Sequence, residues 1–512
     1  MAVIFFALFL RTYELDNRPL HVDEAVHAVK FGELLENGFY KYDPIEYHGP
    51  TLNYLTLVSS TIFGIHSFAE LTEYTIRIVP AIISVLFIIF AIFMFPREEK
   101  HLKYLIIILL SISPILLFYS RYYIQEVLLV SFSYSLIIIC YKYFQSKKTS
   151  FAIVAGILTG LIFATKETSI ITFSSGITSI LILYLFDNDI RKKIIISTNH
   201  VILFISTAIF ISILFYSSFF SNYDGIYDSL KTFSNYFSKA SENGDHIQSW
   251  YYYIELLVYS NNEKIIFSEI FLLLFALIGI YFSLFSKQEN QTIIIFRFLS
   301  FFSFIQIVIY SLIPYKTPWL ALNFWVGLLL LSAFGITKTY SLFAKRISKQ
   351  IYSGVVIIFL IHNLWQTYEI NYKYPFQPEN PFTYSQATCD VVSLTKHITD
   401  VLEAVPDKEN ILISVIVPEN DYWPLPWYFR KFKKVAWNNK IQNSIYKFPI
   451  IISKPVYEDE IINKLYTIPP PGRKNLYVPL FDKYLELRPG VELRGYIQKD
   501  VIDIYNRTNL KP

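Results

Sequence analysis

Residues 76–95, IRIVPAIISVLFIIFAIFMF, form an apolar run whose only charged residue is Arg77. A helix of about 20 apolar residues is long enough to cross the hydrocarbon core of a bilayer, so this run predicts a membrane-spanning helix. Further apolar runs begin near Tyr104, Val127, Phe151, Ser169, Ile194, Ile265, Ile293, Trp319 and Ile351. The sequence therefore predicts a multi-pass helical membrane protein.

The composition of the whole chain agrees with this interpretation. Of the 512 residues, 53% are hydrophobic and 17% are charged, and the mean hydropathy is +0.38. The formal net charge is only +4, which disfavours nucleic acid as a partner. The two cysteines, Cys140 and Cys389, cannot form a disulfide scaffold. The chain has no phosphate-binding loop, nucleophile elbow, zinc-protease helix or dinucleotide fingerprint, which disfavours an ATP-driven pump and a Rossmann-type enzyme.

Charge and proline content divide the chain near residue 370. Charged residues make up about one residue in seven of 1–370 and about one in four of 371–512, and the second part holds 15 of the 23 prolines. We predict a transmembrane domain over 1–370 and an α/β domain outside the membrane over 371–512. Within the second domain, 411–417 and 449–453 are typical of strands, and 425–432 of a helix.

The basic residues of the short loops predict the orientation. The apolar residues 1–10 are too short to span alone, and we interpret them as the outer part of a first helix, which makes about eleven spans. The short loops rich in lysine and arginine then share one side, the cytoplasmic one. The opposite side carries outer loops 11–75 and 217–264 and the C-terminal domain. Residues 51–65 are weakly apolar and fit an interfacial helix.

Two carboxylates and two histidines, at Asp23, Glu24, His21 and His27, gather in outer loop 11–75. Asp23 stands where a helix N-cap would stand, and for an isolated aspartate a cap on a surface helix is the ordinary explanation. At the mouth of a membrane bundle, the same carboxylate is a plausible general base. The neighbouring histidines leave a metal site open as a second interpretation.

Further charged residues lie at the predicted outer turns. The motif Tyr47-His48-Gly49-Pro50 is either a turn that happens to carry a histidine or a device that holds His48 against a lipid phosphate. Arg121 and Glu126 bracket the next turn, where they either pair with each other or act in function, because charge at membrane depth is costly.

Two lysines complete the set of candidates. Lys316 lies between Pro314 and Pro318, and a lysine is a suitable point-charge partner for phosphate. Lys166 precedes Glu167 at another outer helix end, where a lysine that snorkels to the interface is the stronger explanation.

The order of these motifs resembles that of GT-C glycosyltransferases. Asp23-Glu24, His48-Gly49-Pro50 and the Arg121 to Glu126 turn resemble the protein-O-mannosyltransferase and aminoarabinose-transferase group, over roughly residues 11–340. Within this group, the forms His-x-Asp-Glu-Ala, Tyr-His-Gly-Pro and Tyr-Lys-Thr-Pro-Trp, together with tail residues 422–428, resemble an archaeal subfamily identified as flippase-activity-associated Agl proteins.

The resemblance implies roles for the candidate residues. Asp23 would take the proton of the acceptor hydroxyl, with Glu24 in support, and the sugar would be transferred with inversion. His48, Arg121 and Lys316 would bind the phosphate of the donor. His21, His27 and Glu126 would be supporting residues or metal ligands. Whether a divalent cation such as Mg²⁺ or Mn²⁺ takes part stays open, because some GT-C enzymes need one and others do not.

The sequence departs from these relatives at two positions. Relatives commonly carry a lysine where this chain has Gly49, so His48 or another residue must supply the charge. The aminoarabinose group carries an aspartate in the second outer turn, where this chain has Glu126.

We therefore expect a multi-pass glycosyltransferase of the cell membrane. Its expected partners are a polyprenyl-phosphate-linked sugar of the dolichyl-phosphate type and a lipid- or protein-linked acceptor, in protein glycosylation or envelope glycan assembly. The alternative is a non-catalytic membrane protein that handles lipid-linked oligosaccharide or helps to flip it, which would need the cations but not the base. A secondary transporter is less favoured, because the charged residues lie at helix ends rather than near the bilayer midplane.

Overall fold

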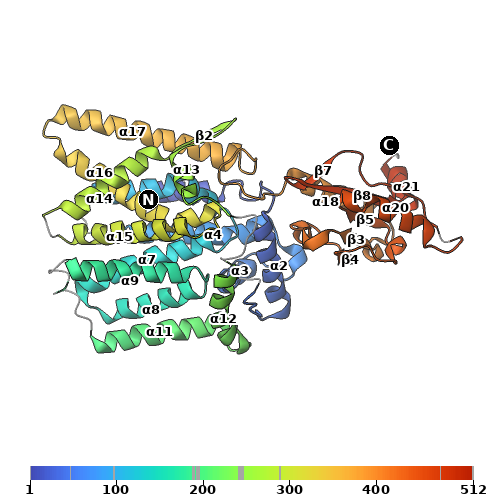
Figure 1. Cartoon of the computed structure of the whole chain (residues 1–512), viewed down its shortest axis with the longest axis horizontal. Helices are drawn as coiled ribbons and strands as arrows, with labels where there is room; N and C mark the ends of the chain where they lie inside the picture. The colour runs from blue at the N-terminus through green and yellow to red at the C-terminus, as the bar shows by residue number, and fades with distance from the viewer. Residues whose placement is uncertain are drawn as a thin grey trace. The chain divides into compact units, whose positions relative to one another are not determined.

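The computed structural model describes residues 2–45, 48–95, 99–186, 191, 197–239, 247–287, 290–472 and 474–509 (Figure 1). The chain forms two compact units. The first comprises 1–16, 33–66 and 72–384, and the second comprises 17–32, 67–71 and 385–512. The second unit thus takes two short segments from the N-terminal part of the chain.

The first unit is a bundle of helices. In chain order its helices, with the one that links it to the second unit, are α1 (Ala2–Thr12), α2 (Val22–Asn37), α3 (Thr51–Ile62), α4 (Glu73–Ala91), α5 (Lys100–Ile112), α6 (Pro114–Ser120), α7 (Glu126–Ser146), α8 (Thr149–Phe163), α9 (Ser169–Phe186), α11 (Thr198–Tyr216), α12 (Asp224–Lys239), α13 (Tyr252–Val258), α14 (Ile270–Phe285), α15 (Gln291–Leu312), α16 (Leu322–Leu342) and α17 (Arg346–Tyr368). A short hairpin of β1 (Ser260–Asn262) and β2 (Ile265–Phe267) follows α13.

Each predicted apolar run contains a helix in the described residues, although the run from Ile265 begins with strand β2 and reaches its helix, α14, only at Ile270. In the part of the chain that the structure describes, seven helices are long and apolar enough to cross a membrane, and the bent pair α5 and α6, with 57° between them, makes an eighth if it is one span. Three shorter apolar helices, α1, α8 and α14, stand where the sequence predicts the remaining spans. The expectation of a multi-pass helical membrane protein is confirmed.

The weakly apolar stretch 51–65 forms helix α3, which does not qualify as a span in the described part of the chain. Its buried side chains are mainly small and polar, and Thr56 Oγ1 is 2.8 Å from the Tyr123 hydroxyl. Val58 and Ile62 are exposed on its other side. A helix with this division of side chains is typical of an interface rather than of a span.

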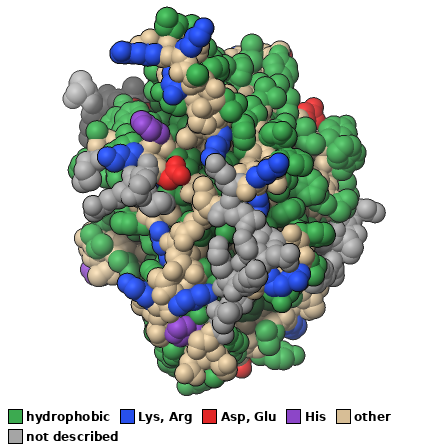
Figure 2. Space-filling model, turned by 90° about the vertical axis from the view of Figure 1, so that its left-hand side faces the viewer, with side chains coloured by type: hydrophobic (Ala, Val, Ile, Leu, Met, Phe, Trp, Pro, Cys, Tyr) green, Lys and Arg blue, Asp and Glu red, His purple; other side chains and the backbone are tan. Residues whose placement is uncertain are grey.

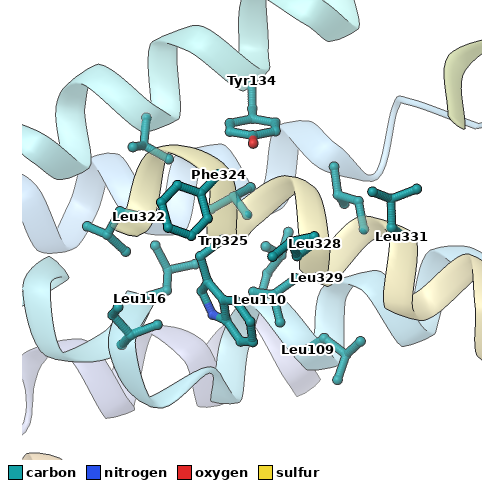
Figure 3. Close-up of a cluster of buried hydrophobic side chains, with 14 of the residues drawn as sticks. Leu109, Leu110, Leu116, Tyr134, Leu322, Phe324, Trp325, Leu328, Leu329 and Leu331 are labelled. Carbon is teal, nitrogen blue, oxygen red and sulfur yellow. The ribbon is translucent and has the colours of Figure 1, made fainter. Parts of the chain in front are cut away.

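Helix α16 is buried from Leu322 to Ile336, and Figure 3 shows several of its side chains, Trp325 among them, packed with those of neighbouring helices. Trp325 is fully buried and donates from Nε1 to Ser113 Oγ at 3.0 Å. The Tyr134 hydroxyl donates to the Asn323 carbonyl and accepts from the Gly327 N–H, each at 2.8 Å. This hydroxyl therefore stands between two groups that would bond to each other in an ordinary helix, and it ties α7 to α16.

Two glycines let α14 and α16 approach closely. A Cβ at Gly335 would lie 2.1 Å from the Phe275 carbonyl oxygen, and one at Gly279 would lie 2.1 Å from the Leu331 carbonyl oxygen. Small residues at such positions are typical of helix contacts in membranes, where packing replaces the hydrophobic effect as the driving force.

A Gly335→Ala substitution is expected to separate α14 from α16 and to lower stability by about 1–3 kcal/mol, because backbone atoms cannot move aside cheaply. Gly176 in α9 is the matched control, because no atom lies within 4 Å of the position that its Cβ would take. Thermal unfolding of the two purified variants checks this. Equal melting temperatures for Gly335→Ala and Gly176→Ala would contradict the close approach.

The second unit contains a six-stranded sheet in the order β4-β3-β5-β8-β6, with β7 paired to β8. Its strands are β3 (Ile413–Ile416), β4 (Val435–Asn438), β5 (Ile450–Ser453), β6 (Tyr477–Pro479), β7 (Leu485–Arg488) and β8 (Val491–Gln498), and its helices are α18 (Cys389–Glu403), α19 (Leu425–Tyr428), α20 (Glu458–Thr467) and α21 (Lys499–Asn509). The strands β4, β3 and β5 are parallel, whereas β8 is antiparallel to its neighbours. The predicted α/β domain is confirmed, although the predicted helix 425–432 is only one turn long.

The first unit extends beyond the predicted boundary near residue 370, to Tyr384. Phe382 packs against Phe118, Tyr119 and Phe267, and its carbonyl accepts a hydrogen bond from the Tyr119 hydroxyl at 2.9 Å. The proline-rich composition of this stretch conceals its packing on the helices. Composition marks where the apolar runs stop, not where the fold divides.

Candidate functional site

Hydrogen bonds of the preceding turn fix the start of helix α2. The His21 N–H donates to Glu24 Oε2 at 2.9 Å, and His21 Nδ1 accepts from the Asp23 N–H at 3.0 Å. These reciprocal bonds are a variant of the capping box, in which a histidine replaces the usual serine or threonine and accepts from the second residue after it instead of the third. Arg18 lies 3.4 Å from the buried Glu24 carboxylate. Glu24 therefore holds the turn rather than facing solvent.

The hydrogen bonds of the cap do not use the Asp23 carboxylate. The sequence places Asp23 at the N-cap, but His21 and Glu24 perform that task in the structure. Among the residues that the structure describes, the Asp23 carboxylate makes no hydrogen bond or ion pair, and the residue is only half-buried. A carboxylate on a fixed turn with unoccupied acceptor atoms is suited to accept a proton from a ligand.

The C-terminal domain anchors the segment that precedes Asp23. The Leu20 N–H donates to the Tyr428 hydroxyl at 2.8 Å, and Gln386 Nε2 donates to the Pro19 carbonyl at 2.8 Å. His21 and Gln386 also form an isolated antiparallel bridge. Tyr428 closes the predicted tail motif 422–428, but nothing in the sequence pairs it with a residue some 400 positions earlier. This hydrogen bond is therefore a structural finding.

The two histidines of this segment are buried. Burial lowers the pKa of His21, while Asp23 and Glu24 act against that shift. His27 is buried on α2, one turn beyond Asp23. Among the described residues, no three His, Cys, Asp or Glu side chains lie together as metal ligands would. The suggested ligand set of His21, His27 and Glu126 is thus not assembled within one unit, since Glu126 belongs to the first.

A second group of candidates begins at the His48 turn. A Cβ at Gly49 would lie 2.2 Å from the Ala164 carbonyl oxygen, which also accepts from Thr51 Oγ1 at 2.6 Å. Only a glycine allows this turn to rest on the backbone at the end of α8. Gly49 is therefore required by packing in this chain. Tyr47 lies outside the described residues.

This packing brings His48 against Glu167. Nδ1 of His48 is 2.8 Å from one carboxylate oxygen and 3.0 Å from the other. Burial alone would raise the pKa of Glu167, but His48, through its charge and hydrogen bond, and Lys166 lower it to about 2. Glu167 is therefore a stable anion that fixes the imidazole ring through Nδ1.

Lys166 forms an ion pair with Glu126, and both side chains are buried. The snorkelling lysine that the sequence favours is wrong, because Glu126, the first residue of α7, draws this side chain inward. Two predicted motifs are thus connected through adjacent residues: Lys166 contacts Glu126, and Glu167 contacts His48. We call His48, Glu126, Lys166 and Glu167 the charged-turn cluster.

Arg121 does not pair with Glu126 in the described contacts. Its guanidinium donates to the carbonyls of Leu10, Tyr13 and Glu14 at 2.7–2.9 Å and lies over the Tyr372 ring at 4.9 Å. These carbonyls end helix α1, and a cation there satisfies acceptors that the helix leaves unpaired. Arg121 therefore holds the end of α1.

Lys316 also donates hydrogen bonds to backbone carbonyls. Its Nζ donates to the Ile313 carbonyl at 2.5 Å and to the Gln248 carbonyl at 3.3 Å, which ties the end of α15 to outer loop 217–264. Desolvation by burial lowers its pKa. The three predicted phosphate ligands therefore differ in surroundings: His48 contacts a carboxylate, whereas Arg121 and Lys316 donate to backbone carbonyls.

The candidates divide between the two units. His21, Asp23, Glu24 and His27 lie in the second unit, with Tyr428 and Gln386. The charged-turn cluster, Arg121 and Lys316 lie in the first. Within the first unit, the structure brings His48 and Glu126 together through residues 166 and 167, and it leaves Arg121 and Lys316 on separate backbone contacts.

Comparison with known families matches the model of the dolichyl-phosphate-mannose-protein mannosyltransferase family to residues 47–216, about a third of the chain. The matched range contains the whole charged-turn cluster and Arg121. Asp23 lies before it and Lys316 after it. The comparison with curated proteins found no match.

Comparison with solved structures finds two crystal structures of ArnT from Cupriavidus metallidurans. The apo structure aligns with a TM-score of 0.63 at 10% identity, over 96% of this chain and 97% of that one. The structure bound to undecaprenyl phosphate aligns with a TM-score of 0.60 at 11% identity, over the same shares. This likeness extends through both units and confirms the predicted fold class, a GT-C-type helical membrane bundle with a C-terminal α/β domain.

Proposed function

We propose that this protein is a membrane glycosyltransferase that transfers a sugar from a polyprenyl-phosphate donor to an acceptor hydroxyl. The observation that carries the proposal is the unengaged Asp23 carboxylate on a turn fixed by His21 and Glu24. Two comparisons support it. The fold is that of a protein whose crystal structure holds undecaprenyl phosphate, and the mannosyltransferase family model covers the charged-turn cluster.

In the proposed reaction, Asp23 accepts the proton of the acceptor hydroxyl as its oxygen attacks the anomeric carbon of the sugar. The bond between that carbon and the phosphate oxygen breaks, and polyprenyl phosphate leaves with the electron pair. Attack opposite the leaving group inverts the configuration. Glu24 and Arg18 hold the turn, so that the base keeps its place as the charge develops.

We assign recognition of the donor phosphate to His48. Glu167 fixes the ring through Nδ1, and in the proposed complex Nε2 donates to the phosphate. Glu126 and Lys166 position the turn that carries Glu167. In this scheme Arg121 and Lys316 serve the phosphate site by fixing the ends of α1 and α15.

The C-terminal domain is proposed to lie on the outer face, with the donor's phosphate. The segments 17–32 and 67–71 of predicted outer loop 11–75 belong to the same compact unit as this domain, which supports a common side. The acceptor is proposed to be lipid- or protein-linked, in protein glycosylation or envelope glycan assembly.

Cysteine labelling tests this placement. In a Cys140→Ser variant the exposed Cys389 is the only cysteine, and an impermeant maleimide is expected to label it on intact cells. Burial and Asp390 raise the pKa of this thiol, so labelling should quicken as the pH rises. Cys389→Ser is the control and should stay unlabelled. Labelling of Cys389 only after permeabilisation would place the domain on the other side.

Tyr428 is expected to affect transfer through the position of Asp23. A Tyr428→Phe variant removes the acceptor for the Leu20 N–H, and we expect about a tenfold loss of kcat with a stability loss of about 1 kcal/mol. Tyr457→Phe removes a hydroxyl that donates to the Asn439 carbonyl elsewhere in the same unit and should leave kcat unchanged. Equal activity of both variants would remove the positioning role.

The proposed function is tested by incubating the purified protein with a panel of polyprenyl-phosphate hexoses and pentoses and a mixture of membrane acceptors. Mass spectrometry then follows consumption of each donor. We expect one class of donor to yield polyprenyl phosphate together with a sugar-bearing product. Binding of the donors without turnover would favour the alternative, a protein that handles lipid-linked oligosaccharide without catalysis.

A further inference from the structure

A groove of about 500 Å³ lies between the last turn of α16 and the first half of α17. Arg346, Lys349 and Gln350 line one end of it, and Gly354 and Ile357 line the other. Its volume is within the range of small-molecule sites. The turn between these helices belongs to the left-hand end of the bundle in Figure 1, the face that Figure 2 shows.

The charge that the described residues place around this groove is positive. Residues 290–368 contain no aspartate or glutamate, whereas Lys338, Lys345, Arg346 and Lys349 fall within twelve positions of one another. Within the described part of the chain, none of the four forms an ion pair. Figure 2 shows lysine and arginine predominating over acidic side chains on this face. An anionic ligand is the complement of such a groove.

The groove changes from polar to apolar along the helix. From Arg346 to Ile357, eleven residues of α17 rise about 16 Å, close to half the thickness of a hydrocarbon core. Lys349 lies over the Tyr340 ring, with 5.3 Å from Nζ to the ring centroid, which keeps its charge at the polar end. Gly354 has nothing within 4 Å of a Cβ position, so the floor of the groove is open there.

The surface around the groove faces lipid. Only 11% of the apolar window of the span that begins at Arg346 is buried inside the protein, and Ile351, Ile358 and Ile361 of α17 are exposed. A soluble anion would occupy only the polar end of the groove, at Arg346 and Lys349. A molecule that uses the whole groove must join an anionic headgroup to an alkyl chain.

We propose that this groove binds an anionic phospholipid from the leaflet at the basic end of the bundle. The phosphate lies between Arg346 and Lys349, with Gln350 and Ser353 as hydrogen-bond donors, and one acyl chain follows Gly354 and Ile357. This binding site is independent of the transferase chemistry and of the donor phosphate assigned to His48.

Native mass spectrometry of the purified full-length protein tests the proposal with phosphatidylglycerol, phosphatidylcholine and inorganic phosphate as probes. We expect phosphatidylglycerol adducts that an Arg346→Gln/Lys349→Gln double variant weakens about tenfold in apparent affinity. Phosphatidylcholine should bind no better to the wild type than to the double variant. A large excess of inorganic phosphate should leave the phosphatidylglycerol adducts in place.

Two further variants separate the groove from general surface charge. Gly354→Leu puts a side chain into the open floor, keeps every charge and should also weaken phosphatidylglycerol about tenfold. Lys148→Gln removes an exposed cation from the loop between α7 and α8 and should change the affinity less than about twofold. Equal binding by wild type and Gly354→Leu would overturn the proposal. Displacement by inorganic phosphate would do the same, by assigning the groove to a soluble anion.

Discussion

An Asp23→Asn variant is expected to lose sugar transfer by at least about 100-fold in kcat while it remains folded. A positioned general base contributes about 10²–10⁴ to a rate, and asparagine cannot take the acceptor proton. The substitution keeps the shape of the side chain and the Asp23 N–H bond to His21 Nδ1, so the capped turn should survive. Steady-state transfer from a polyprenyl-phosphate sugar, with the melting temperature of each preparation, provides the measurement.

Asp16→Asn is the matched control. Asp16 is exposed in the same predicted outer loop, and the substitution removes the same charge without touching the capped turn. It should retain wild-type kcat. Glu24→Gln has a different expected signature, because it weakens the cap and the contact with Arg18 and should lower stability together with activity. Wild-type kcat in Asp23→Asn would refute the assignment of the base.

A Lys166→Met variant is expected to destabilise the protein by about 3–5 kcal/mol. It leaves the buried Glu126 carboxylate without its lysine, and an unpaired buried charge is costly. Glu126→Gln should cost less, because Lys166 still interacts electrostatically with Glu167, whose pKa it lowers. Reversible unfolding of each purified variant in detergent measures the difference.

The double variant Glu126→Gln/Lys166→Met completes the cycle. With both charges removed, its loss of stability should be smaller than the sum of the two single losses, and the coupling measures the ion pair. Additive losses would show that the two residues do not interact. The same variants should lower transfer only as far as they disturb the turn that holds His48.

The spans follow from the sequence because burial in lipid requires long apolar runs with internal hydrogen bonding. Arg77 is the only charged residue within 76–95, and its local contacts explain why the helix tolerates it. Arg77 lies in the second turn of α4, where it donates to the Leu15 carbonyl at 3.0 Å and is fully buried. The boundary between the two units could not be predicted from composition. Residues 371–384 are polar and proline-rich, yet they pack on the helices of the first unit.

The candidate site was only partly predictable, because its decisive contacts join residues far apart in the chain. The residue types around Asp23 indicate a helix start, but spacing alone cannot tell that His21 and Glu24 form the cap. A lysine near a helix end usually reaches outward, and only the fold places Glu126 where Lys166 turns inward. Tyr428 carries no local signal of its bond to Leu20.

Gly49 shows what a departure from a family pattern can signify. Read from the sequence, it is the loss of a positive charge. In the structure it is the residue that lets the His48 turn meet the Ala164 carbonyl, which places the imidazole on Glu167. The glycine and the anchored histidine are therefore two aspects of one packing arrangement.

The central claim is that the protein breaks the bond between a sugar and a polyprenyl phosphate with Asp23 as the base. Its most direct test measures, in one reaction of the reconstituted protein, both the polyprenyl phosphate released and the sugar attached to the acceptor. The prediction is equal amounts of the two products from wild type and Asp16→Asn, and neither from Asp23→Asn. Donor that stays intact with wild-type protein, or equal yields from Asp23→Asn, would contradict the claim.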